Sequence, residues 1–290
     1  MPNLDAWLAA GERVPVPLGG TTRGIFVRTA GEGAWCTLLH GFPTSSFDWH
    51  RVFDALCGRR RVLAFDFLGF GDSDKPADHE YSIHEQADLA ERLWERRGVE
   101  STALVAHDYG VSVAQELLAR HLDGALRVGI ERLVLLNGGL YPELHRPQPA
   151  QLMLLDPETG PKLGKLMTEE TFAASLRPTF SPTHPPSPAD LACAWHAVSR
   201  RGGPEVAHRL IRYIRDRERH RDRWVAALET APLERTFIWG MLDPVSGSHM
   251  AERIAQRLPE AELVRLEDVA HWPQLEAPDR VAANLMRMLA

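Results

Sequence analysis

The sequence predicts an α/β fold in which a mostly parallel sheet is flanked by helices and a helical segment is inserted between two strands. Short apolar runs of strand length alternate with amphipathic segments of helical length. This alternation stops over 141–225, where prolines punctuate amphipathic segments, and it resumes afterwards. The chain has 290 residues, of which 44% are hydrophobic, enough for one large buried core. We therefore expect a first core part over 1–140, a helical cap over 141–225 and a second core part over 226–290.

The predicted elements follow one another in the order that such a sheet requires. A pair of strands is expected over 12–29, around a turn at Gly19-Gly20. Further strands are predicted by apolar runs at 35–39, 61–65, 103–106, 132–137, 235–239 and 261–266. Apolar residues at helical spacing predict helices within 45–57, over 82–97, soon after residue 110, over 248–258 and over 278–290.

Composition and charge argue against several classes of protein. The net charge of −6 indicates neither a nucleic-acid partner nor an anionic membrane surface. The three cysteines lie far apart without metal-ligand spacing, which suits a reducing compartment, and the glycines at 69 and 71 lack a dinucleotide-binding pattern. The N-terminus does not resemble a signal peptide, and no apolar run reaches membrane-spanning length. We expect a cytoplasmic monomer or homodimer that uses no metal or cofactor.

One strongly charged stretch runs from 209 to 223. Acidic residues are interleaved with the basic ones and no aromatic platform accompanies them, so a nucleic-acid patch is not indicated. The charged residues expected to form a solvated helix face are Arg212, Arg215, Asp216, Arg217, Glu218, Arg219 and Arg221.

The stretch 101–120 predicts a strand, a sharp turn and a helix in immediate succession. Asp108 lies at the turn, with the small residues Ala106 and Gly110 two positions before and after it. This spacing is typical of a nucleophile elbow, in which a strained residue sits between a strand and a helix that approach closely. The alternative interpretation is that Asp108 is only a helix N-cap.

Two further polar residues follow predicted strands. Asp243 comes after 235–239 and His271 after 261–266, so both are expected with Asp108 at the carboxyl edge of the sheet. The order nucleophile, acid, histidine is that of a catalytic triad. Taken alone, Asp243 could be a turn former before Pro244, and His271 could be a buried core histidine.

The turn His40-Gly41-Phe42-Pro43 follows the strand at 35–39. We expect it to supply one amide of an oxyanion hole, from Phe42, while Tyr109 supplies the other. His40 is expected to hold this loop together.

Together these motifs resemble the aspartate-nucleophile branch of the α/β-hydrolase superfamily, which includes epoxide hydrolases and haloalkane dehalogenases. The resemblance covers nearly the whole chain. Within that branch the chain looks most like the mesoderm-specific-transcript subgroup. The resemblance rests on His40-Gly-Phe-Pro, Asp66-x-x-Gly-Phe-Gly-x-Ser, His107-Asp-Tyr-Gly, Leu136-Asn-Gly-Gly-Leu-Tyr-Pro, Gly240-x-x-Asp243 and His271-Trp-Pro.

The resemblance implies a hydrolase that forms a covalent alkyl ester on Asp108. Water activated by His271, which Asp243 orients, would then hydrolyse the ester. Dehalogenases that resemble this chain usually carry tryptophan after the nucleophile and often asparagine in the oxyanion loop, where Tyr109 and Phe42 stand here. Both departures count against halide release. Epoxide hydrolases also commonly have tryptophan after the aspartate, but they share the His-Gly-Phe-Pro loop, so opening of an epoxide to a vicinal diol is the leading expectation.

Epoxide hydrolases protonate the epoxide oxygen with tyrosines of the cap. Tyr141 and Tyr213 are therefore candidate donors, with His145 as a third, although both tyrosines could equally be packing residues. Haloalkane dehalogenation, ester or lactone hydrolysis, and a hydrolase-fold binding protein without turnover stay as alternatives.

The cap is expected to close over the site and form an apolar cavity for a small apolar organic substrate and water. Its expected lining or packing residues are Met153, Leu154, Leu155, Leu163, Leu166, Met167, Phe172, Leu176 and Phe180.

Overall fold

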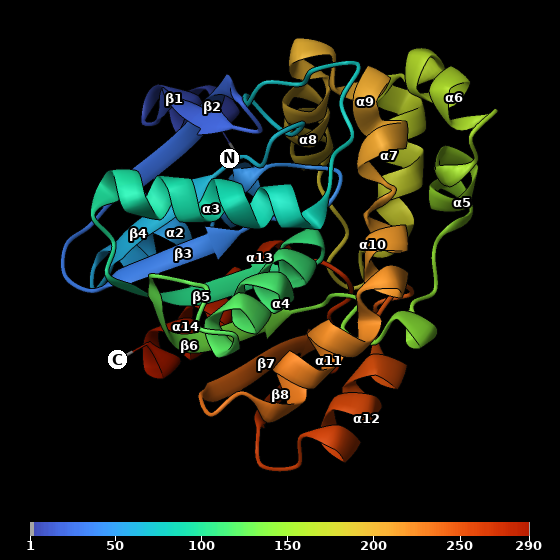
Figure 1. Ribbon diagram of the computed structural model, residues 1–290. Coiled ribbons are helices and arrows are strands. Elements are labelled where there is room, and N and C mark those ends of the chain that lie inside the picture. The colour runs from blue at the N-terminus through green and yellow to red at the C-terminus, as the bar shows by residue number, and fades with distance from the viewer. Residues whose placement is uncertain (1–2, 290) are drawn as a thin grey trace.

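The computed structural model describes residues 3–289, which are built around one central sheet (Figure 1). Its strands are β1 (Glu12–Leu18), β2 (Thr21–Ala30), β3 (Trp35–Leu39), β4 (Arg61–Phe65), β5 (Ser101–His107), β6 (Gly129–Leu136), β7 (Glu234–Gly240) and β8 (Glu262–Leu266). Within the described residues their order across the sheet is β1-β2-β4-β3-β5-β6-β7-β8. β2 pairs antiparallel with β1 and β4, and the remaining neighbours run parallel, which confirms the predicted mostly parallel sheet.

Helices cover both faces of this sheet. The flanking helices are α1 (Leu4–Ala9), η1 (Ser46–Trp49), α2 (Phe53–Cys57), α3 (Ile83–Arg97), α4 (Tyr109–Leu122), α11 (Arg221–Thr230), α12 (Ser248–Arg257), α13 (Pro273–Glu276) and α14 (Pro278–Met288). Residues of β5 alternate between the two layers, as a strand requires: Leu104 and Ala106 pack with α3 and α4, whereas Ala103 and Val105 face the layer of α2 and α14. The sheet is therefore buried on both sides, as its apolar strands predict.

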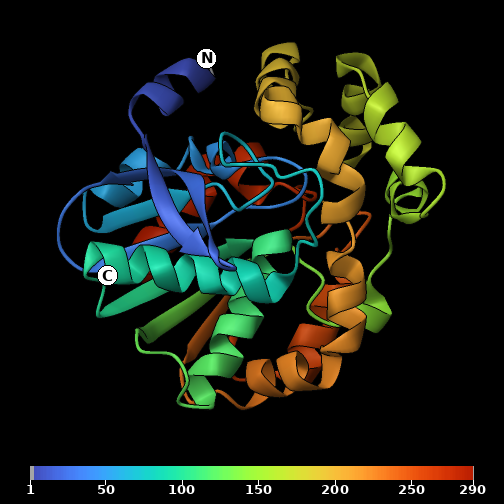
Figure 2. The same ribbon diagram turned by 45° about the horizontal axis from the view of Figure 1, so that its top comes forward.

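The cap lies between β6 and β7 and stands beside one edge of the sheet (Figure 2). Its helices are η2 (Pro142–Leu144), α5 (Pro149–Leu155), α6 (Gly160–Leu166), α7 (Glu169–Leu176), η3 (Arg177–Thr179), α8 (Pro188–Ser199), η4 (Arg200–Gly202), α9 (Gly203–Leu210) and α10 (Tyr213–Arg219). Pro149 and Pro188 open two of these helices, at the position where proline's missing N–H has no helical partner to lose. The prolines that interrupt the sequence pattern thus begin helices.

Helix α11 spans the predicted cap boundary at residue 225. It packs against α4, and the Trp224 indole donates a hydrogen bond of 2.7 Å to Oε2 of Glu116. The helical layer of the core therefore includes residues that the sequence pattern groups with the cap.

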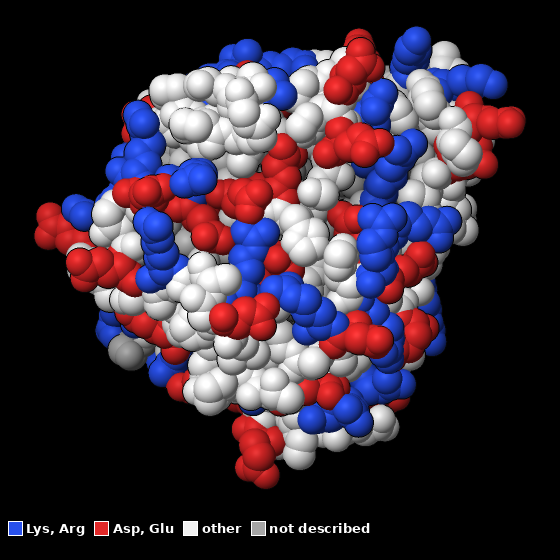
Figure 3. Space-filling view, viewed as in Figure 1, with Lys and Arg blue, Asp and Glu red and all other residues white. Residues whose placement is uncertain are grey.

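The charged run is exposed for the most part. Arg212, Arg215 and Arg219 face solvent, and basic and acidic side chains are interspersed on this face of the molecule (Figure 3). Arg217 is the exception: its side chain is 1% exposed, so its assignment to the solvated face was wrong. Within residues 3–289, no helix is both long and apolar enough to cross a membrane.

Candidate active site

Asp108 occupies the one-residue turn between β5 and α4. Its backbone is at φ 45° and ψ −104°, a region that side-chain-bearing residues rarely adopt. Helix and strand approach so closely here that a Cβ on Gly110 would lie 2.5 Å from the carbonyl oxygen of Leu39. Strand, strained turn and small neighbour together give the geometry of a nucleophile elbow.

The carboxylate of Asp108 is held by the neighbouring loop. Its Oδ2 accepts a hydrogen bond of 2.9 Å from the backbone amide of Phe42. Among the hydrogen bonds of residues 3–289, none joins the Tyr109 amide to this carboxylate, so that donor stays a prediction. The loop itself is fixed by His40, whose Nε2 accepts from the Phe67 amide at 3.1 Å and whose Nδ1 contacts the Gly41 carbonyl at 2.8 Å.

His271 and Asp243 are brought together as the sequence order predicts. His271 Nδ1 lies 2.9 Å from Asp243 Oδ2, and both side chains are buried. The Asp243 carboxylate also accepts hydrogen bonds from the Val245 amide at 2.7 Å and the Ser246 hydroxyl at 2.7 Å. Asn137, which directly follows β6, donates to the same Oδ2 at 2.9 Å. The imidazole orientation is thus fixed through a fully hydrogen-bonded carboxylate.

These buried groups shift one another's ionisation. Burial alone would lower the pKa of His271, but Asp243 and then Asp108 oppose it and raise that pKa to about 9. Burial would raise the pKa of Asp108, but the charges of His271 and Arg217 outweigh it and lower that pKa. At neutral pH the site therefore holds two carboxylates and an imidazolium.

Arg217 brings a second cation to Asp108. Its Nη2 lies 3.6 Å from Asp108 Oδ1 and donates to the Asp108 carbonyl at 3.4 Å, while its Nε donates to the Ser112 hydroxyl at 2.7 Å. The guanidinium carbon stands 4.4 Å from the ring centre of Tyr213, one turn earlier on α10. The two oxygens of Asp108 therefore differ: Oδ2 faces the Phe42 amide and Oδ1 faces Arg217.

The three candidate proton donors lie in different surroundings. The Tyr213 hydroxyl is buried and makes no hydrogen bond of regular geometry; burial followed by the charge of Asp108 raises its pKa, and the neighbouring Arg217 opposes that shift. Nε2 of His145 is likewise buried and unpartnered; burial and then Arg217 lower the His145 pKa to about 3, so the ring is neutral. The Tyr141 hydroxyl instead donates to Glu229 at 3.2 Å, and Arg253 lies over its ring. Tyr141 thus differs from the other two candidates in having a partner for its hydroxyl, and its role as a donor stays a prediction.

A cavity of about 320 Å³ leads from the cap to the site and touches Phe42, Val245 and His271. Most of the apolar cap residues expected to line a cavity do so here. They are Met153, Leu154, Leu163, Leu166, Met167, Phe172 and Leu176.

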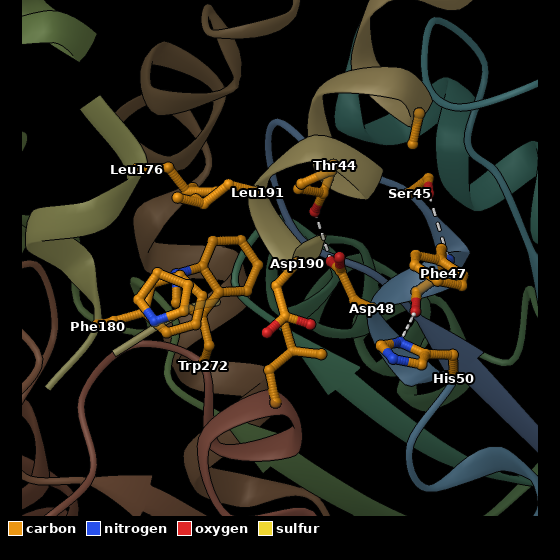
Figure 4. Close-up of a pocket in the computed structure, with 14 residues that line it drawn as sticks. Thr44, Ser45, Phe47, Asp48, His50, Leu176, Phe180, Asp190, Leu191 and Trp272 are labelled. Carbon is orange, nitrogen blue, oxygen red and sulfur yellow. Dashed lines mark hydrogen bonds between the residues drawn. The ribbon is translucent and has the colours of Figure 1, made fainter. Parts of the chain in front are cut away.

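A second cavity, of about 30 Å³, lies behind Trp272 (Figure 4). Phe180, the eighth of the expected lining residues, borders this one and stacks on Trp272 with ring centres 5.8 Å apart. Its floor carries Asp48, which accepts a hydrogen bond from Thr44 at 2.5 Å. The volume is enough for water but not for an organic substrate, so the larger cavity is the candidate substrate site. The ninth residue, Leu155, borders a third cavity, which is also lined by His145 and Arg217.

Sequence reasoning missed Arg217 and Asn137. Arg217 follows Leu210, Tyr213 and Ile214 at spacings of seven, four and three, and all four side chains are buried. Helical phase, rather than the charge of the surrounding run, would have placed Arg217 on the inner face. Asn137 stands immediately after a predicted strand, the same signal that identifies Asp108 and Asp243. Among residues 3–289, no three His, Cys, Asp or Glu side chains cluster as a metal site would require.

Comparisons with known proteins agree on the fold. The family model for the alpha/beta hydrolase fold matches residues 37–278. The chain is 37% identical to a putative hydrolase, LipZ, of Mycobacterium tuberculosis over 289 residues, covering 99% of this chain and 98% of the relative. It is 42% identical over 259 residues to the human mesoderm-specific transcript homolog protein, covering 87% and 77%.

More distant similarities follow the same pattern. A haloalkane dehalogenase of Mycobacterium bovis is 27% identical over 261 residues, with 88% of each chain covered. A crystal structure of an alpha/beta hydrolase fold protein from Burkholderia ambifaria matches with a TM-score of 0.79 at 24% identity, over 95% of this chain and 97% of that one. At that identity the structural likeness speaks for the fold alone.

Proposed function

The chain belongs to the α/β-hydrolase fold family and is an enzyme of the hydrolase class, and we propose that it opens epoxides to vicinal diols through a covalent ester of Asp108. The observation that carries this proposal is the nucleophile position itself. A carboxylate stands at the strained turn, with Oδ2 on the Phe42 amide and the His271–Asp243 pair beside it. A carboxylate attacks an sp³ carbon bearing a strained or stable leaving group more readily than it attacks an ester.

In the first step Oδ1 of Asp108 attacks an epoxide carbon. A carbon–oxygen bond forms to the carboxylate as the ring carbon–oxygen bond breaks. The released oxygen takes a proton, for which the buried hydroxyl of Tyr213 is the best supported donor because it lies within the influence of Asp108 and Arg217. The product is a hydroxyalkyl ester of Asp108 and a tyrosinate.

In the second step a water molecule cleaves this ester. Esterification removes the negative charge of Asp108, one of the carboxylates that raise the His271 pKa, so the imidazolium releases its proton to solvent more easily and the neutral imidazole can act as base. His271 takes a proton back from solvent when the Asp108 charge returns at the end of the cycle. Hydroxide adds to the Asp108 carbonyl carbon, and the oxyanion forms on Oδ2, against the Phe42 amide. Collapse expels the diol oxygen, which takes the proton held by His271. The proton left on Asp108 returns to Tyr213.

Two side chains support an epoxide rather than a halide as the leaving group. The residue after the nucleophile is Tyr109, whose ring packs against Phe67 and Phe70 and offers no indole N–H. The indole of Trp272 borders the cavity, but its Nε1 donates to Thr179 Oγ1 at 2.8 Å. A halide would therefore lack the N–H donors that usually hold it. Haloalkane dehalogenation remains the second candidate because a relative of that name is 27% identical over most of the chain.

The covalent intermediate can be trapped by removing the base. A His271→Gln variant should accumulate the ester when incubated with styrene oxide, and intact-protein mass spectrometry should show a mass increase of one substrate molecule. Peptide mapping should place the added mass on Asp108. A parallel incubation with 1-bromohexane, which adds only its alkyl group, tests the dehalogenase alternative.

The double variant His271→Gln/Asp108→Asn is the matched control and should stay unmodified. Wild-type enzyme in excess over styrene oxide in ¹⁸O-water should give unlabelled diol in the first turnover, because the new oxygen comes from Asp108. Labelled diol in that turnover, with no adduct on the trapping variant, would exclude the ester mechanism.

A further inference from the structure

Arg217 carries a hydrogen-bonding group that the fold does not use. Nε and Nη2 of its guanidinium contact Ser112 and Asp108, but Nη1 is buried and has no hydrogen-bond partner. Leaving a buried N–H without an acceptor costs free energy, and the cost is larger when the N–H belongs to a charged group than when it belongs to a neutral one. The side chain of Arg217 is also almost completely buried, with 1% of it exposed.

The guanidinium borders a small cavity on one side. Arg217 and His145 both line a third cavity, of about 130 Å³, in which the cap helices α5 and α10 take part. Nε2 of His145 is also buried without a partner. On the opposite side the backbone approaches so closely that a Cβ on Gly139 would lie 2.2 Å from Nη1. Arg217 and His145 thus bring unpartnered nitrogen atoms to one cavity, and the Tyr213 ring lies beside Arg217.

The change of charge on Asp108 during the proposed reaction indicates a role for Nη1 of Arg217. In the resting site Arg217 is compensated by Asp108, with Nη2 3.6 Å from Oδ1. Forming the ester neutralises Asp108. In the proposed first step its negative charge passes to the released substrate oxygen and, once that oxygen takes the Tyr213 proton, to the tyrosinate, whose ring centre lies 4.4 Å from the Arg217 guanidinium carbon. Until that proton transfer Arg217 would have only the released oxygen to pair with, and a buried cation without a partner is strongly unfavourable. A second anion beside the reacting carbon would keep Arg217 paired through the step.

We propose that Arg217 is a substrate-binding residue that takes an anionic oxygen of the substrate next to the reacting carbon, using Nη1. The inference rests on the proposed function for its chemical step, but the binding site it describes does not require turnover. The anionic oxygen can come from either of two parts of the substrate. One is the oxygen released when the epoxide opens, and the other is a carboxylate substituent that the substrate already carries.

Anion binding can be measured without catalysis in an Asp108→Asn variant, which imitates the neutral ester. Titration calorimetry with acetate and with phenylacetate should show both binding to this variant roughly 10- to 100-fold more tightly than to Asp108→Asn/Arg217→Gln, as expected for a hydrogen bond to a charged group. Neutral 2-phenylacetamide should not distinguish the two variants. The double variant removes both charges together, so it leaves no unpaired buried ion.

Two further variants separate binding from folding. Asp108→Asn/Arg217→Lys keeps the charge and should retain part of the anion affinity. Asp108→Asn/Arg215→Gln changes an exposed arginine on the same helix, which pairs with Glu218, and should bind like Asp108→Asn. If neither carboxylate binds Asp108→Asn more tightly than the Arg217→Gln double variant, with both folded by their urea unfolding curves, Arg217 is only a structural ion-pair partner and the proposal is wrong.

The rate of ester formation identifies which oxygen of the substrate Arg217 binds. It is compared in His271→Gln and His271→Gln/Arg217→Gln, with styrene oxide and with 3-phenyloxirane-2-carboxylate. Equal slowing of both substrates assigns Arg217 to the released oxygen, and slowing of the carboxylate substrate alone assigns it to the substituent. No slowing beyond that of His271→Gln/Arg215→Gln contradicts the proposal. If His271→Gln itself forms no ester, the proposed function fails, while the calorimetric result still decides whether Arg217 binds anions.

Discussion

Nδ1 of His271 and Oδ2 of Asp243 lie 2.9 Å apart, and both side chains are buried. The pair unites residues that are 28 positions apart in sequence and follow adjacent parallel strands, β7 and β8. Since Asp243 is the largest influence that opposes burial on His271, the pair determines how the protein responds to pH as well as how it would activate water.

The stability contributed by His271 should disappear at alkaline pH. Its folded pKa, about 9, lies above the ordinary value of 6.5, so the stabilisation is fully present below pH 6.5 and is lost as pH rises through about 9. The shift corresponds to on the order of 3 kcal/mol. Urea unfolding of wild type and His271→Gln at pH 6 and pH 10 should show that the destabilisation by the substitution shrinks at the higher pH.

Replacing Asn137 by alanine should slow the second chemical step and weaken the fold. The side chain donates to Asp243 Oδ2 and to the Gly240 carbonyl, and it accepts from the Gly240 amide at 2.7 Å. We expect a loss of about 3 kcal/mol in unfolding free energy, because Asp243 and both backbone groups of Gly240 each lose a hydrogen bond. Under the proposed mechanism the ester on Asp108 should accumulate during steady-state turnover and be visible by mass.

Asn284→Ala is the matched control for this substitution. Asn284 donates to the Arg280 carbonyl and accepts from Arg287, both in exposed hydrogen bonds on α14, so stability and turnover should stay near wild type. Fast ester hydrolysis in Asn137→Ala would show that Asp243 keeps its position without Asn137.

Gly110→Ala should destabilise the protein by about 1–3 kcal/mol, as overpacking does. The added Cβ would stand 2.5 Å from the Leu39 carbonyl oxygen, and the backbone of β3 cannot move aside without breaking sheet pairing. Gly129→Ala tests the same change at the start of β6, where the nearest atom would be Ser101 Cβ at 3.4 Å. Thermal unfolding should separate the two variants, and equal melting temperatures would mean that the elbow has room for a side chain.

Asp72→Asn should loosen the contact between core and cap. Asp72 lies in the loop after β4 and accepts from Arg200 of the cap at 2.7 and 3.0 Å and from Arg201 at 3.2 Å. Its side chain is 9% exposed, so we expect a loss of about 1–2 kcal/mol, with faster hydrogen exchange in α8 and α9.

The pair of Asp78 and Arg209 also joins core to cap and provides the comparison. Its atoms are 3.4 Å apart and Asp78 is fully exposed, so Asp78→Asn should change stability by less than about 0.5 kcal/mol. Equal effects of the two substitutions would show that burial does not decide the strength of these pairs.

The sheet was predictable because its signals are local. The run at 101–107 and the helix after it carry their own periodicity, and Asp108 is identified by its place between them. Helix α1 was not predicted because Leu4–Ala9 is too short to show a helical period. The two residues that pair across the site, Asp243 and His271, could be proposed because the strand ends of a parallel sheet meet at one edge.

The cap side of the site was harder to predict because its side chains are placed by partners distant in sequence. Tyr141 points its hydroxyl at Glu229, 88 positions later, and no local pattern contains that partner. The charged residues around Arg217 predict a solvated helix face. Its helical spacing from buried residues predicts the buried position that it has. Its buried position follows from Asp108 and Ser112, more than 100 positions earlier.

The cap leaves the sheet after β6 and rejoins it at β7, and these two strands are hydrogen-bonded neighbours. Insertions or deletions inside the excursion therefore need not disturb strand register. The cap can therefore change in sequence and length while the carboxyl edge of the sheet stays the same. A graft of residues 146–200 from a homologue offers a direct way to change substrate selectivity while Asp108, Asp243 and His271 are kept.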